Sequence, residues 1–260
     1  MVNEVFAIRY GTRARTRAQT FYEYDTYREP DGPLELSFYF WVVRHDAGVV
    51  LFDTGYSDAA ARRHGRTEPF LVEPVTALRA LGIDVGDVTH VVVSHAHWDH
   101  TGNVDKFPTA EVVIQSAELD FWTSRHAEED VLRAHLERED IDFLQSLEAT
   151  GRLRPVSGDL DIVPGVRSVV VGGHTPGQVI LIVDTPRGDV VLASDSLHMY
   201  EEMERRRPFH AFTDLPDSFD AYSTLQELQD NGAVIVAGHD PLVMERFPLV
   251  EGTDFAVRVR

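Results

Sequence analysis

The chain has 260 residues, and its 24 Lys and Arg against 43 Asp and Glu give a formal net charge of −19. A field of this sign repels phosphate backbones and anionic membrane surfaces, so the composition argues against nucleic acid and membranes as partners. The hydrophobic fraction of 43% and the charged fraction of 26% are ordinary for a soluble globular protein and exclude a disordered chain. Cysteine is absent, which excludes disulfides, thiolate ligands and cysteine nucleophiles.

The chain is long enough to bury one sizeable core, and no repeat, linker or shift in composition marks a boundary. We therefore expect a single domain over 1–260, in which residues 1–35 form an N-terminal extension and a loop at the mouth of the substrate site. The longest apolar runs, such as 38–43 and 179–183, are far shorter than the roughly 20 residues of a membrane span. With no apolar signal segment at the start, these features predict a cytoplasmic protein.

Short apolar runs bounded by Gly, Asp, Pro or Ser predict buried strands. In chain order they are 36–43, 48–55, 89–95, 111–115, 167–173, 178–185, 189–195 and 233–239. Helical periodicity predicts helices over 74–81, 120–149 and 218–230, the last capped by Asp217 or Ser218. The expected core face of the longest helix comprises Val131, Leu132, Leu136, Ile141, Leu144 and Leu147. Mixed strands and helices of this kind predict a layered α/β protein with sheets inside and helices outside.

Four of the predicted strands are followed directly by a histidine or an aspartate. These residues are His95, His174, Asp195 and His239. Polar side chains at strand ends are rigidly placed, and packing does not explain their presence. We therefore expect them to converge on one site at one rim of the sheets.

The densest group of potential metal ligands is the segment 94–100, which has the sequence SHAHWDH. Neutral imidazole and carboxylate together suit zinc and related divalent metals. A loop that begins at a strand end can turn His95 and His97 to one side and Asp99 and His100 to the other. This arrangement predicts two metal ions rather than one, and paired ions about 3.5–4 Å apart are a known hydrolytic device.

Counting ligands assigns them to two sets bridged by one carboxylate. We expect Asp195 to bridge, because a carboxylate has two oxygens to share. Asp53, in the sequence LFDTG, is expected to orient the metal loop from behind without binding an ion. We favour zinc for both ions, with manganese, iron and cobalt as alternatives. The expected sets are His95, His97 and His174 for one ion, and Asp99, His100 and His239 for the other.

The same motifs are shared with a known family. The strings SHAHWDHTG, GGHTPGQ, the strand-end SD at 194–195 and GHDP, with LFDTG upstream, resemble the metallo-β-lactamase superfamily over residues 36–241. The resemblance implies a four-layer αβ/βα sandwich with a dinuclear metal site at the edge between two sheets. It does not give the substrate, because one scaffold hosts many reactions.

Within that superfamily the chain is similar to the quorum-quenching N-acyl-homoserine lactonases and their relatives. The similarity lies in length, in the GHTPG and GHD segments and in an N-terminal extension. Flavodiiron members carry a glutamate where His97 stands, and glyoxalase II has a C-terminal helical domain that this chain lacks. The best-known lactonases place a tyrosine three residues after the bridging aspartate, where this chain has His198. Tyr200 is the other residue that could supply the hydroxyl.

The resemblance implies a metal-dependent carboxylic ester hydrolase that opens an N-acyl-homoserine lactone or a related lactone by attack of a metal-bridging hydroxide. Asp99 is expected to pass a proton to the leaving oxygen, and His198 to hydrogen-bond the substrate carbonyl or that oxygen. Hydrolysis of another ester, a thioester or a cyclic amide is the alternative, followed by an iron-dependent redox reaction. The expected partner is a small-molecule substrate, and a homodimer is left open.

Aromatic and methionine side chains are dense in two segments that we expect to be loops. We expect them to form an apolar wall for an acyl chain or a ring, with packing in the core as the alternative. The residues are Phe21, Tyr22, Tyr24, Tyr27, Met199, Tyr200, Met203, Phe209 and Phe212.

Overall fold

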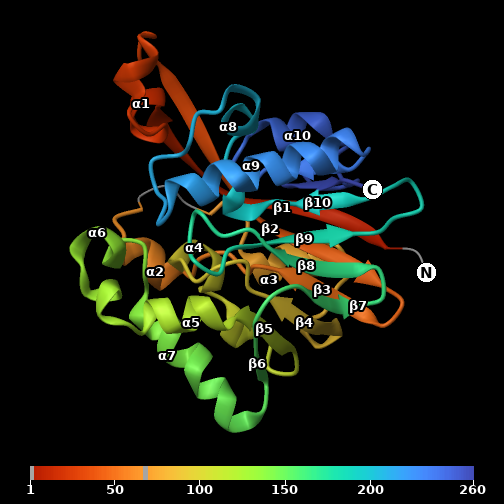
Figure 1. Ribbon diagram of the computed structural model, residues 1–260. Coiled ribbons are helices and arrows are strands. Elements are labelled where there is room, and N and C mark those ends of the chain that lie inside the picture. The colour runs from red at the N-terminus through yellow and green to blue at the C-terminus, as the bar shows by residue number, and fades with distance from the viewer. Residues whose placement is uncertain (1–2, 67–69) are drawn as a thin grey trace.

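Two β-sheets stacked face to face, with helices on both outer sides, make up the computed structural model (Figure 1). It describes residues 3–66 and 70–260, so residues 1, 2 and 67–69 of the expected domain lie outside the described residues. The larger sheet contains, in spatial order, β12 (Ala256–Arg258), β1 (Glu4–Thr16), β2 (Pro33–His45), β3 (Gly48–Phe52), β4 (Val88–Val92), β5 (Glu111–Gln115) and β6 (Leu153–Val156). The smaller sheet contains β11 (Val234–Val236), β10 (Val190–Leu192), β9 (Val179–Val183), β8 (Val166–Val170) and β7 (Leu160–Val163).

Helices cover the two outer faces, which completes four layers and confirms the predicted αβ/βα sandwich. On the larger sheet lie α2 (Asp58–Arg63), α3 (Pro74–Ala80), α5 (Ser116–Trp122) and α7 (Arg138–Ser146); on the smaller lie α8 (Tyr200–Arg205), α9 (Leu215–Asp230) and α10 (Leu242–Arg246). Short helices α1 (Arg17–Thr20), α4 (Trp98–Thr101) and α6 (Asp130–Arg133) lie in connections. The 3₁₀ turns are η1 (Tyr24–Tyr27), η2 (Val85–Asp87), η3 (Val104–Lys106), η4 (Arg125–Glu128), η5 (Leu147–Thr150) and η6 (Ser194–Ser196).

Alternation along the strands explains why the larger sheet is apolar on both faces. In β1, Phe6 and Ile8 pack in the cluster under the outer helices, whereas Val5 and Ala7 pack in the cluster that faces the smaller sheet. The period of two that every strand imposes sends neighbouring residues to opposite faces. Both sides of the sheet are therefore buried, and its edge is where polar side chains collect.

The eight predicted strands are all present, but four others were missed, namely β1, β6, β7 and β12. The segment expected to be an extension and loop contains β1, which pairs with β2 from Glu4 opposite Arg44 to Thr16 opposite Pro33. Its arginines and threonines hide the apolar alternation from sequence analysis. Together β1 and β2 form a long hairpin that projects from the molecule beside α1 (Figure 1).

The long helix predicted over 120–149 is wrong, because the segment breaks into α5, η4, α6, α7 and η5. Ser124 starts a new turn by accepting the N–H of His126 at 3.2 Å. Farther on, the carbonyl of His135 accepts the N–H of Trp98 at 3.1 Å rather than a helical partner. These contacts override the helical propensity of the local sequence. Val131, predicted to be in the core, is 79% exposed.

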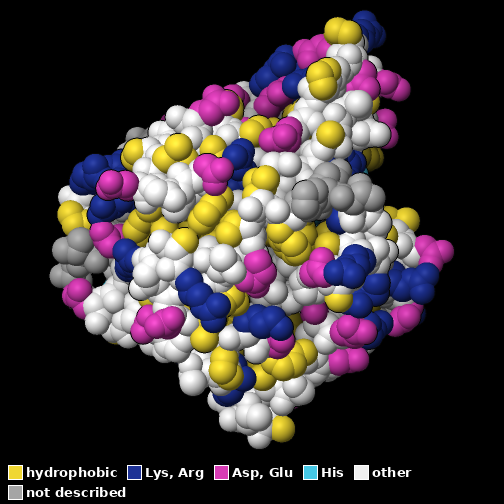
Figure 2. Space-filling view, turned by 180° about the vertical axis from the view of Figure 1, so that it is seen from behind, with side chains coloured by type: hydrophobic (Ala, Val, Ile, Leu, Met, Phe, Trp, Pro, Cys, Tyr) yellow, Lys and Arg dark blue, Asp and Glu magenta, His cyan; other side chains and the backbone are white. Residues whose placement is uncertain are grey.

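The surface carries charges of both signs. Figure 2, seen from behind, shows Lys and Arg interspersed with Asp and Glu, and small groups of hydrophobic side chains between them. None of the helices in the described residues is long and apolar enough to cross a membrane.

Helix α9 begins earlier than predicted, with Asp214 rather than Asp217 or Ser218 as its cap. The Asp214 carboxylate accepts the N–H of Asp217 at 3.0 Å, and a proline occupies the first turn. A side-chain oxygen at this position satisfies an N–H that has no partner within the helix.

Replacing the cap tests this assignment. We expect Asp214→Ala to lower the free energy of unfolding by about 1 kcal/mol, because it removes the acceptor for an unpaired N–H. Asp217→Ala is the matched control and should cost less, since it removes an acidic residue of the first turn but no capping bond. Urea denaturation of the metal-loaded proteins gives both values. Equal losses in the two variants would contradict the cap assignment.

Candidate metal centre

The topology brings five strand ends to one edge of the sandwich. Strands β3 and β4 run parallel, as do β10 and β11. Strand β8 is antiparallel to β9, which is antiparallel to β10, so β8 also ends on this side. The loops that leave these ends carry Asp53, His95, His174, Asp195 and His239.

All seven predicted ligand residues lie together at this edge, in two sets. Within each set the candidate ligand atoms lie within 4.8 Å of one another. Asp99 is partly exposed, and the other six residues are buried. The division agrees with the sets counted from the sequence, and Asp195, the predicted bridge, is grouped with the first of them. The sets are His95, His97, His174 and Asp195, and then Asp99, His100 and His239.

Asp195 lies between the two sets, and each of its oxygens faces one of them. Its Oδ1 lies 3.0 Å from Nε2 of His239 and 3.3 Å from Nε2 of His100. Its Oδ2 lies 3.4 Å from Nε2 of His174 and 3.9 Å from Nε2 of His95. This placement is the one that a bridging carboxylate requires.

Hydrogen bonds from the outer ring nitrogens fix how the imidazoles face. Nδ1 of His174 donates to the carbonyl of Ala211 at 2.9 Å, and Nδ1 of His239 donates to that of Ser37 at 2.8 Å. A carbonyl can only accept, so in the neutral rings the hydrogen is on Nδ1 and the Nε2 lone pair points inward. This is the orientation that metal-binding histidines need.

Asp53 supports the loop from behind, as its predicted role requires. Its carboxylate accepts the N–H and the hydroxyl of Ser94, both at 2.7 Å, and the hydroxyl of Ser194 at 3.0 Å. Nδ1 of His100 lies 2.8 Å from Asp53 Oδ2. Asp53 itself has φ of 64°, a left-handed conformation that non-glycine residues seldom adopt and that the turn into the site demands.

The charges at the site favour cations. Burial lowers the pKa of His95, His97 and His174 well below the usual range, which leaves them neutral and able to coordinate. Burial acts to raise the pKa of Asp195, but nearby histidines hold it well below its usual value. Nε2 of His100 and Oδ1 of Asp195 are buried with no hydrogen-bond partner among the described residues. These donor atoms fit divalent metal ions.

The family model described as the metallo-beta-lactamase superfamily matches residues 39–239, a span that includes both sets of ligand atoms. The chain belongs to this superfamily. The match covers most of the chain, and its ends agree closely with the resemblance over 36–241 predicted from the motifs.

Curated relatives point to one branch of the superfamily. The chain is 26% identical to an N-acyl homoserine lactonase of a Bacillus species over 228 residues, which cover 81% of this chain and 84% of the relative. It is 27% identical to N-acyl homoserine lactonase AttM of Agrobacterium fabrum over 220 residues, which cover 78% and 81%. The predicted resemblance to the lactonase branch and the predicted enzyme class, a metal-dependent hydrolase, are confirmed by these relatives and the superfamily match.

Solved structures share the fold. One is an N-acyl homoserine lactone hydrolase with the product N-hexanoyl-L-homoserine bound at its catalytic metal centre. It superposes with a TM-score of 0.74 at 22% identity and covers 95% of this chain and 97% of that one. A quorum-quenching N-acyl homoserine lactone lactonase gives 0.71 at 23% identity, with 93% of each chain covered. At this identity the likeness confirms the fold and leaves the substrate to be argued from the site.

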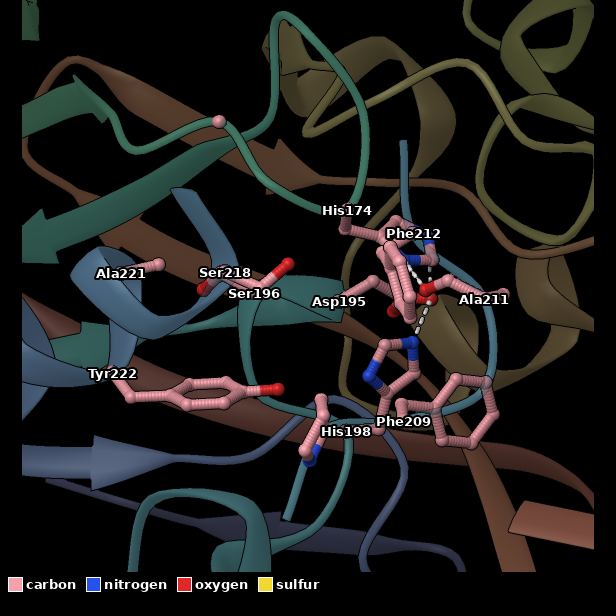
Figure 3. Close-up of a pocket in the computed structure, with 12 residues that line it drawn as sticks. His174, Asp195, Ser196, His198, Phe209, Ala211, Phe212, Ser218, Ala221 and Tyr222 are labelled. Carbon is pink, nitrogen blue, oxygen red and sulfur yellow. Dashed lines mark hydrogen bonds and ion pairs between the residues drawn. The ribbon is translucent and has the colours of Figure 1, made fainter. Parts of the chain in front are cut away.

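Of the two candidates for the lactonase tyrosine position, His198 borders the centre and Tyr200 does not. Nε2 of His198 lies 3.1 Å from Oδ2 of Asp195, and the ring stacks on Phe209 with centroids 3.7 Å apart (Figure 3). The hydroxyl of Tyr200 donates to the carbonyl of Ile235 at 3.2 Å in the core, so it faces away from the two ligand sets.

The predicted apolar wall is smaller than expected. Phe209 and Phe212 line a small cavity next to Asp195 and His198. Tyr22 packs edge-on against Phe212 with ring centroids 4.9 Å apart. Most of the others, including Phe21 and Met203, are buried in the two core clusters, which is the packing alternative.

Sequence analysis missed a buried glutamate that ties two ligand loops together. Glu118 accepts the N–H of Ala96 at 3.0 Å, the N–H of Gly177 at 2.8 Å and the indole N–H of Trp122 at 2.8 Å. Two of these partners are backbone groups on other loops, so no local pattern could have revealed the role. Glu118 holds the loop of His97 against the loop of His174.

A second missed residue is Glu202, which contacts His198. It accepts the N–H of Met199 at 2.6 Å and the hydroxyl of Tyr222 at 2.7 Å, and its Oε2 lies 3.4 Å from Nδ1 of His198. The signal was present in the sequence, because residues four apart at the start of a helix face each other.

Metal content tests the two-set geometry. We expect about two divalent ions per chain in the metal-replete protein, and about one in His100→Ala, because that histidine belongs to one set. His126→Ala, which removes an exposed histidine outside both sets, is the control and should leave the number unchanged. Elemental analysis gives the count. A single ion whose number is unaffected by His100→Ala would contradict a dinuclear centre.

Proposed function

We propose that this chain is a dinuclear metal hydrolase that opens the ring of an N-acyl-homoserine lactone or a related lactone. The observation that carries the proposal is the carboxylate of Asp195, which offers one oxygen to each of two sets of ligand atoms. The curated relatives named as lactonases and the fold shared with a product-bound lactone hydrolase direct the proposal to lactones.

The residues that would hold the ions are the two sets described above. His95, His97, His174 and Asp195 offer three imidazoles and a carboxylate, and the second set offers two imidazoles, Asp99 and the other oxygen of Asp195. Nitrogen and oxygen ligands without thiolate suit zinc. When bound, two such ions supply Lewis acidity and lower the pKa of water from 15.7 to about 7, so that hydroxide is available at neutral pH.

Ring opening consumes one water molecule and moves its protons. The water oxygen bonds to the carbonyl carbon, and the bond from that carbon to the ring oxygen breaks. One proton ends on the new hydroxyl, and the other leaves as the new carboxylic acid ionises. Asp99, which lines the cavity and is partly exposed, can accept the proton of the attacking water and return it to the leaving oxygen.

His198 is placed to donate a hydrogen bond to the substrate. Burial acts to lower the pKa of His198, but the negative charges of Asp195 and Glu202, which flank its ring, outweigh burial and raise the pKa to about 9. With Nδ1 facing Glu202, a charged ring can donate from Nε2 toward the carbonyl or the leaving oxygen.

A substrate panel tests the reaction class. We expect hydrolysis of γ-lactones to be faster than hydrolysis of the corresponding thiolactone and lactam, since the relatives named as lactonases suggest a lactone substrate. Removal of metal with a chelator should abolish the activity, and zinc should restore it. Turnover of the thiolactone or lactam with no turnover of any lactone would overturn the proposal.

Substitution of His198 tests its role separately from metal binding. A hydrogen bond made mainly in the transition state is worth roughly 1–3 kcal/mol, so we expect His198→Phe to lower kcat by about 5- to 150-fold. His198→Tyr should retain much of the activity, because a phenol can also donate. Both variants should keep two ions. An unchanged kcat in His198→Phe would make the residue a lining group, and loss of an ion would make it a ligand.

A further inference from the structure

Three arginines line one side of the cavity that holds the candidate metal ligands. They are Arg13 and Arg15 on β1 and Arg66, which follows α2. The same cavity is lined by His97, Asp99 and other residues of the two ligand sets. Guanidinium groups are therefore gathered at the site of a chain whose formal net charge is −19.

Strand geometry and hydrogen bonds hold these arginine side chains in defined positions. Arg13 and Arg15 are two residues apart in a strand and so point to the same face. Arg13 is opposite Leu36 in β2, and Leu36 also lines the cavity. Arg66 is buried; it donates to the carbonyl of Thr12 at 2.9 Å and its Cζ lies 4.4 Å over the ring of Phe38. Two elements far apart in sequence thus present their charges to one space.

Arg15 is the member of this group whose charge is least compensated. Its guanidinium donates to the carbonyl of Gln19, a neutral group, and it makes no ion pair with the described residues. Its Nε is buried with no hydrogen-bond partner among them. Burial, and then repulsion from Arg13 and Arg66, lowers the pKa of Arg15 to about 10.

Two arginines outside the cavity show the contrast with Arg15. Arg17 pairs with Glu201, and Arg207 pairs with Glu29 at 2.7 Å. The protein therefore has acidic partners for arginines of this region. Arg15 has no acidic partner among the described residues, so an anion in the cavity would relieve the repulsion that it experiences from Arg13 and Arg66.

We propose that this side of the cavity binds a carboxylate carried by the substrate, so that the enzyme prefers an acid-bearing lactone to a neutral one with an apolar chain. The guanidinium fork matches the planar carboxylate with two parallel hydrogen bonds. The cavity also contains residues of both ligand sets, so a carboxylate bound by these arginines would lie beside the ring to be opened. The inference rests on the proposed function, because it names the class of lactone opened at the same site.

The test compares one lactone in two forms. The substrates are 5-oxotetrahydrofuran-3-carboxylate and its carboxamide, which are nearly equal in shape but differ in charge. For the metal-loaded wild type at low ionic strength, we expect kcat/KM to be at least about 10-fold higher for the acid, and salt should reduce this ratio. Arg15→Gln should bring the ratio down about 10-fold, and Arg15→Lys should keep part of it.

Arg62→Gln is the matched control, because Arg62 is exposed on α2 and pairs with Asp58 outside the cavity. It should leave the ratio unchanged. A wild-type ratio near one, or the same ratio in wild type and Arg15→Gln, would overturn the inference. Two checks guard against a folding defect in Arg15→Gln. Its metal content should equal that of the wild type, and Arg15→Lys, which keeps the charge, should keep part of the ratio.

Failure of the proposed function has a different signature. If neither form and no lactone of the substrate panel is hydrolysed, ring opening is not the reaction, and calorimetric titration of the metal-loaded proteins with both forms then decides the inference alone. Tighter binding of the acid that is lost in Arg15→Gln supports the arginine site. Binding of the acid that is equal in wild type and Arg15→Gln would mean that the metal ions hold the carboxylate, which overturns it.

Discussion

The buried carboxylate of Asp195 is the group on which the arrangement of the site depends. Burying a charge is costly unless other charges and hydrogen bonds compensate for it. Here the compensation comes from imidazoles of four loops, with Nε2 of His239 at 3.0 Å and Nε2 of His100 at 3.3 Å on one oxygen alone. Asp53 adds a second buried carboxylate behind His100. Burial keeps His95, His97 and His174 neutral, so the two acids are left with a demand for positive charge that divalent ions can meet, and metal binding would stabilise this edge.

The two sheets are joined at this edge by backbone hydrogen bonds as well as by side chains. The N–H of Val179 in the smaller sheet donates to the carbonyl of Ser94 at 3.0 Å, and the N–H of Ser37 donates to that of His239 at 2.9 Å. Glu118 fastens the loop of His97 to that of His174. Because the ligands come from loops that other loops hold, the positions of the donor atoms are set by the packing of the sandwich rather than by any one segment.

Sequence reasoning succeeded where the chemistry is local and failed where it is not. The clustering of the candidate ligands could be predicted because His95 to His100 lie within one short loop and the others directly follow apolar strands. Strand β1 was missed because its arginines interrupt the apolar alternation, and the long helix was wrong because contacts such as that of Trp98 with the carbonyl of His135 replace helical bonds. Glu118 acts on backbone groups of distant loops, so no motif marks it. The arginine group joins residues about fifty positions apart, and spacing alone could not place Arg66 beside Arg15.

The net charge and the arginines act over different distances, which reconciles an acidic protein with an anionic ligand. At physiological ionic strength the Debye length is about 8 Å, so the overall charge of −19 is largely screened for a small molecule in solution. Inside the cavity screening is weak, and the nearest charges decide what binds. There the carboxylates of Asp99 and Asp195 belong to the two ligand sets, whereas Arg13, Arg15 and Arg66 line the cavity beside them. Acidic side chains of the candidate metal ligands and guanidinium groups thus lie in one space, so under the proposed function a substrate with a negatively charged group would be oriented by the same charges that position its ring for hydrolysis.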